Sequence, residues 1–109
     1  MKIAIRTHDV TLTEALRALV TRRLSSAFDR LGPTVRAIDV TLSDVNGPRG
    51  GVDKHCRLRV HSDTAAPVVV VAVAAELEAA ITAAAERAAR VVVRTRVRQR
   101  GFAPLEAAS

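Results

Sequence analysis

The apolar residues of this chain follow two different periods, and this division constrains the fold more than any other feature. They alternate with polar residues in three short segments and run almost unbroken in a fourth, which is typical of β-strands. They recur every three to four residues in two longer segments, 13–31 and 75–98, which is typical of amphipathic helices. The four predicted strands are 2–8, 35–43, 54–61 and 68–74.

The predicted element order is therefore β-α-β-β-β-α, in an α+β fold. Two amphipathic helices can bury their apolar stripes together only on one face of the four-stranded sheet, so we expect both helices on that face. We expect the last three strands to form an antiparallel meander, and the valines of 68–74 indicate the best-covered strand. The length of 109 residues fits a single domain, which we place at 1–100 and follow with a flexible tail at 101–109.

Composition excludes several classes of protein. Apolar residues make up 49% of the chain and charged residues 26%, as in folded globular domains. Aromatic residues make up only 2%, so the chain lacks the stacking platforms of many single-strand binders. A lone cysteine, Cys56, no leader peptide and no apolar run long enough to cross a membrane predict a cytoplasmic protein with neither a disulfide nor a membrane partner.

The positive charge is concentrated near the C-terminus. The chain has a formal charge of +6, and segment 86–100 holds six arginines against one glutamate. Four of them follow a helical spacing and are expected along one flank: Arg87, Arg90, Arg94 and Arg98. A row of guanidinium groups suits phosphate oxygens, whereas the alternative is an ordinary solvated helix face.

Further cations are candidates for the same surface. The first predicted helix offers Arg22, Arg23 and Arg30, which are mixed with acidic residues, and Arg23 is the strongest candidate of the three. Lys54 follows a glycine-rich loop that either touches RNA or simply holds the hairpin. The predicted RNA-binding residues are Arg22, Arg23, Lys54, Arg87, Arg90, Arg94 and Arg98.

Metal binding and catalysis are not expected. His55, Cys56 and His61 resemble a zinc set, but strand alternation points Cys56 inward and both histidines outward, and no second cysteine exists. The serines belong to no nucleophile motif, and the loop glycines lack a P-loop ending. We therefore predict no catalytic residue, metal, cofactor or small-molecule substrate.

The element order, the run Thr13-Glu14-Ala15-Leu16-Arg17 with Val20 and Arg23-Leu24, and the basic last helix together resemble the hibernation-promoting factor and ribosome-associated translation inhibitor family. The glycine-rich segment from Asp44 to Cys56 resembles a short-form branch of that family. The resemblance implies a cytoplasmic bacterial protein that binds the small ribosomal subunit where messenger and transfer RNA would sit. The implied activity is reversible inhibition of translation on idle ribosomes.

Two alternatives remain open at this point. One is a protein-interaction module whose exposed sheet face, with Arg6, Arg57 and Arg59, docks an acidic protein or pairs with itself. The other is generic binding of double-stranded RNA, which predicts equal affinity for any long duplex. Self-association is allowed by the sequence but not implied by it.

Overall fold

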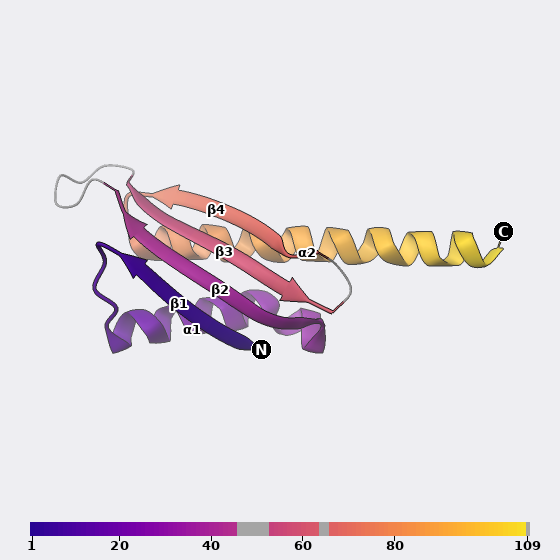
Figure 1. Ribbon diagram of the computed structural model, residues 1–109, viewed down its shortest axis with the longest axis horizontal. Helices are drawn as coiled ribbons and strands as arrows, with labels where there is room; N and C mark the ends of the chain where they lie inside the picture. The colour runs from indigo at the N-terminus through magenta and orange to yellow at the C-terminus, as the bar shows by residue number, and fades with distance from the viewer. Residues whose placement is uncertain (46–52, 64–65, 109) are drawn as a thin grey trace.

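The protein is a two-layer α+β domain, with a four-stranded sheet in one layer and both helices in the other (Figure 1). The computed structural model describes residues 1–45, 53–63 and 66–108, without the side chains of 32–33 and 96–108. The predicted fold class and element order are confirmed. The elements are β1 (Lys2–His8), α1 (Glu14–Phe28), the 3-10 helix η1 (Asp29–Thr34), β2 (Val35–Asp44), β3 (Lys54–Ser62), β4 (Val68–Ala74) and α2 (Leu77–Ala108).

Helix α1 begins with a threonine cap. The Thr13 hydroxyl oxygen accepts a hydrogen bond from the backbone N–H of Leu16 at 3.1 Å, which satisfies one of the free donors of the first turn. The helix ends at Phe28, earlier than expected, and the chain tightens into η1 before the proline at position 33. Such 3-10 turns are frequent at helix ends, and this one keeps Leu31 buried in the core.

The strands lie in the order β1-β2-β3-β4. Strands β2, β3 and β4 form the predicted antiparallel meander, with Asp44 opposite Lys54 at one end of the β2–β3 pair. Strand β1 lies parallel to β2, with Ile5 opposite Val40, and α1 forms the crossover that two parallel neighbours require.

The core lies between the sheet and the helices. Strands β2 and β3 contribute Ile38, Val40, Leu42, Cys56, Leu58 and Val60, which are at most 1% exposed. Helix α2 contributes mainly small side chains: Ala80, Ile81, Ala84, Ala85, Ala88 and Val92. Because an alanine side chain ends at Cβ, this face of α2 can lie close to the sheet and to α1.

The expectation that β4 is the best-covered strand is wrong. β4 lies at an edge of the sheet, and its alternate valines, Val69, Val71 and Val73, are 47%, 43% and 44% exposed on the face away from the helices. Only Val70 and Ala72 of this strand enter the core. A run of valines marks high β-propensity, which does not distinguish a strand covered on both faces from an edge strand covered on one.

Helix α2 is longer than expected. The sequence pattern places its end near Arg98, whereas its backbone is helical to Ala108 and continues past the end of the sheet (Figure 1). The flexibility of segment 101–109 stays a prediction.

A compact charge cluster lies at the base of the β2–β3 hairpin. The Lys54 ammonium nitrogen is 2.9 Å from Asp53 Oδ1 and 3.3 Å from Asp44 Oδ2, while the backbone N–H of Val45 donates to the Asp53 carbonyl at 3.1 Å. The Asp53 side chain is fully buried and that of Lys54 is 18% exposed. The hydrogen bond that Lys54 donates to Asp53, together with the contact to Asp44, raises the pKa of Lys54, so this ammonium stays charged and compensates the buried carboxylate.

We expect the Lys54→Met variant to lose unfolding free energy, because removing one partner leaves the buried Asp53 carboxylate uncompensated. Urea denaturation followed by circular dichroism measures this loss. The double variant Asp53→Asn/Lys54→Met should recover part of it. A double variant as unstable as the single one would contradict the role of the cluster.

Burial makes the Cys56 thiol unreactive. It raises the pKa of Cys56 to about 12, and only the thiolate is a good nucleophile. At pH 8 the folded protein should react with a thiol reagent at least on the order of 100-fold more slowly than the unfolded chain. Equal rates with and without urea would contradict the burial of the thiol.

The raised pKa of Cys56 also makes stability depend on pH, because the folded state favours the protonated thiol. The contribution of this thiol to the free energy of unfolding is complete below pH 9.0 and is lost as pH rises toward 12.

Candidate nucleic-acid interface

A shallow groove runs between the end of α1 and the middle of α2. Its first hollow, of about 520 Å³, is lined by Ala27, Arg30, Leu31, Ala89, Arg90, Val93 and Arg94. A second hollow is lined by Arg23, Ser26, Ala27, Arg30, Thr82, Ala85 and Glu86. Because Ala27 and Arg30 line both hollows, the two form one continuous surface, which we call the helix groove.

The helix groove combines short side chains with long basic ones. Ala27, Ala85 and Ala89 are too short to fill the space between the helices, so it stays hollow. Arginines from both helical segments stand around it, and the lining of the first hollow includes no carboxylate. This arrangement makes the half of the helix groove around Arg90 and Arg94 strongly positive.

The three arginines of the first hollow, Arg30, Arg90 and Arg94, are free to bind an external anion. Within the described part of the chain, the ion pairs involve Arg23, Arg36, Lys54 and His61, and none involves these three. Glu86 and Arg90 lie four residues apart, a spacing that predicts an ion pair on a helix, but no such pair is among the ion pairs of the described residues. Three unpaired guanidinium groups around one hollow can each offer two parallel N–H donors to a phosphate.

Arg23 is partly committed to an internal contact. Its Nη2 donates to Glu78 Oε1 at 2.6 Å, which links α1 to the first turn of α2. Both side chains are largely exposed, so the pair contributes about 0–1 kcal/mol to stability. Arg23 therefore lies at the acidic end of the helix groove, near Glu78 and Glu86.

Arg87 lies apart from the other predicted arginines of α2. Its Nη1 donates to the backbone carbonyl of Val71 on β4 at 2.6 Å, so it reaches the edge of the sheet, while Arg90 and Arg94 line the helix groove. The single line of arginines expected along one flank is therefore divided between two places.

The remaining predicted residues lie outside the helix groove. Arg22 is exposed on α1 but lines neither hollow, and Lys54 is held by two carboxylates at the hairpin base. The Arg98 backbone belongs to α2, and its side chain lies outside the described residues, as does the loop at 46–52. Arg30 lines both hollows, although the mixed charges around it in the sequence kept it out of the predicted RNA-binding residues. Its position seven residues after Arg23, about two helical turns, could have placed both arginines on one flank.

Two other possibilities raised by the sequence concern metal binding and membrane insertion. The described residues contain no group of three or more histidine, cysteine or acidic side chains that could hold a metal ion. Within the same residues, no helix is both long enough and apolar enough to cross a membrane.

The chain is similar to known proteins in both sequence and fold. The N-terminal domain of Protein Y from Thermus thermophilus superimposes with a TM-score of 0.73 at 23% identity, over 87% of this chain and 99% of that one. A ribosomal subunit interface protein from Coxiella burnetii gives a TM-score of 0.70 at 14% identity, over 89% and 99%. Both likenesses show the fold, and a search of curated protein sequences gives no significant match.

The sequence profile of one family matches residues 3–100, which is nearly the whole chain. The predicted resemblance to hibernation-promoting factors is thereby confirmed. The chain belongs to the family described as Sigma 54 modulation protein / S30EA ribosomal protein.

Proposed function

We propose that this protein binds ribosomal RNA of the small ribosomal subunit through the helix groove and inhibits translation sterically during stasis. The observation that carries the proposal is the set of three unpaired arginines, Arg30, Arg90 and Arg94, around one groove in a member of the S30EA family. The Coxiella burnetii relative is a ribosomal subunit interface protein, which supports the same partner.

The chemistry of the helix groove favours phosphate contacts over base recognition. Neither hollow is lined by an aromatic side chain, so bases have no stacking partner there. Guanidinium groups at the rim suit phosphate oxygens, and the alanines let a backbone approach closely. Binding would therefore depend on RNA shape and charge, with little sequence readout.

Steric occupation explains the inhibition without catalysis. The one thiol is fully buried with a raised pKa, and the carboxylates of the hairpin cluster are engaged with Lys54. A protein that covers RNA needed by messenger and transfer RNA blocks both by occupying their place. We infer a cytoplasmic binding factor and not an enzyme.

Co-sedimentation with purified small subunits, large subunits and bare ribosomal RNA tests the proposal. We expect selective binding to small subunits, and an affinity loss of at least about 100-fold for the Arg30→Glu/Arg90→Glu/Arg94→Glu variant, because three phosphate contacts become repulsive. The matched control is Arg6→Glu/Arg57→Glu/Arg59→Glu, which makes the same charge change on the opposite face and should retain most of the affinity. Equal losses of affinity in both variants would show that binding depends on the net charge of the protein and not on the helix groove.

Salt dependence gives an independent count of the phosphate contacts. Each contact contributes about −0.7 to −0.9 to the slope of log affinity against log salt, so neutral Arg30→Gln/Arg90→Gln/Arg94→Gln substitutions should flatten the slope by about 2 to 3. Filter binding with small subunits between low and moderate salt measures the slopes. Unchanged slopes would place the contacts elsewhere, and equal affinity for any long RNA duplex would favour generic duplex binding.

A further inference from the structure

The face of the sheet opposite the helices carries an ordered pattern of side chains. Strand pairing aligns Arg6 with Thr41 and Arg57, and the neighbouring row aligns Ala4 with Asp39 and Arg59. On β4, Val71 and Val69 continue these two rows. The basic side chains of β1 and β3 therefore stand on either side of the shorter side chains of β2, and the valines of β4 follow at the edge of the sheet. We call this surface, the side of the sheet away from the helices, the open face.

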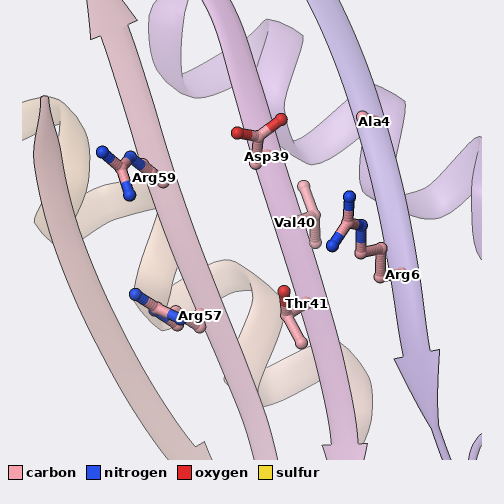
Figure 2. Close-up of a pocket in the computed structure, with 7 residues that line it drawn as sticks. All are labelled: Ala4, Arg6, Asp39, Val40, Thr41, Arg57 and Arg59. Carbon is pink, nitrogen blue, oxygen red and sulfur yellow. The ribbon is translucent and has the colours of Figure 1, made fainter.

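A hollow lies over the middle of the open face. It has a volume of about 240 Å³ and is lined by Ala4, Arg6, Asp39, Val40, Thr41, Arg57 and Arg59. Figure 2 shows Arg6 leaning from β1 toward β2, whereas Arg57 and Arg59 lean from β3 toward β4. The guanidinium groups of Arg57 and Arg59 thus lie on the side of the exposed valines.

These three arginines have no anionic partner within the described part of the chain. The Asp39 carboxylate is 2.9 Å from His61 Nε2, and none of the ion pairs involves Arg6, Arg57 or Arg59. With three arginines and one aspartate, the lining of the hollow has a net charge of +2. An occupant of complementary charge would be anionic.

The exposed valines indicate that the occupant carries apolar groups as well as negative charge. Val69, Val71 and Val73 present a continuous apolar column beside Arg57 and Arg59, about 4.8 Å away across the strands. A phosphate backbone could pair with the arginines but would leave the valines uncovered, and the four strands carry no Phe, Tyr or Trp to stack a base. A protein segment can supply carboxylates and aliphatic side chains at neighbouring positions.

We propose that the open face docks an acidic protein segment that carries aliphatic side chains beside its carboxylates. Its carboxylates would pair with Arg57 and Arg59, while its aliphatic groups cover the valine column. A second copy of this chain fits poorly, because its own open face would bring Arg6, Arg57 and Arg59 against the same three cations. The site lies on the opposite side of the sheet from the helix groove, so both surfaces can be occupied together.

Nuclear magnetic resonance titration of the labelled full chain tests this proposal with three probes. The first is a short peptide in which Glu alternates with Leu, the second is a Glu-only peptide of equal length, and the third is oligouridylate. We expect the Glu-Leu peptide to shift the amide signals of Arg57, Arg59, Val69 and Val71, and to bind at least about tenfold more tightly than the Glu-only peptide, a difference of about 1.4 kcal/mol.

Variants separate the charged and the apolar parts of the site. Arg57→Glu/Arg59→Glu and the nearly isosteric Val69→Thr/Val71→Thr should each weaken binding of the Glu-Leu peptide about tenfold or more. Arg30→Glu/Arg90→Glu/Arg94→Glu should leave it unchanged, so failure here is distinct from failure of ribosome binding. Equal affinity for both peptides, preferential shifts with oligouridylate, or no binding of the Glu-Leu peptide would each overturn the proposal.

Discussion

Helix α2 packs on the sheet through alanine side chains, and the surfaces of the protein depend on this close contact. Ala80, Ala84 and Ala88 are fully buried, so the helix lies near enough to β3 and β4 to cover the core with small side chains. Three other alanines, Ala85 and Ala89 of α2 and Ala27 of α1, leave space between the two helices, which becomes the helix groove. A bulkier face on α2 would lift the helix, fill the groove and separate Arg90 and Arg94 from Arg30.

Most of the fold could be predicted from the sequence because the hydrophobic period differs clearly between strands and helices. The bounds of β1 and β4 agree with the expectation, and β2 and β3 are each one residue longer. The environment of β4 could not be predicted, because valine has the same β-propensity whether one or both faces are covered. The order of the strands determines which of them lies at an edge. That order depends on tertiary packing, and the hydrophobic period of a single segment does not predict it.

The candidate site was predictable only as a collection of charges. The sequence indicates which helices are basic, and the structure adds which side chains already have partners. Lys54 contacts both Asp53 and Asp44, and Arg23 contacts Glu78, a residue 55 positions away in the chain. Contacts of this range depend on how the elements pack, so helical spacing alone treats an engaged cation and a free one alike.

The hydrogen bond from Arg87 to the Val71 carbonyl has a consequence for how copies of the chain behave at high concentration. An edge strand with exposed valines is a template on which another chain can extend the sheet, as in fibril growth. The guanidinium group of Arg87 occupies one backbone acceptor of that template and places a positive charge beside it. An incoming strand would have to displace this donor and bring its own backbone up to a cation, so Arg87 opposes extension of the sheet at this edge.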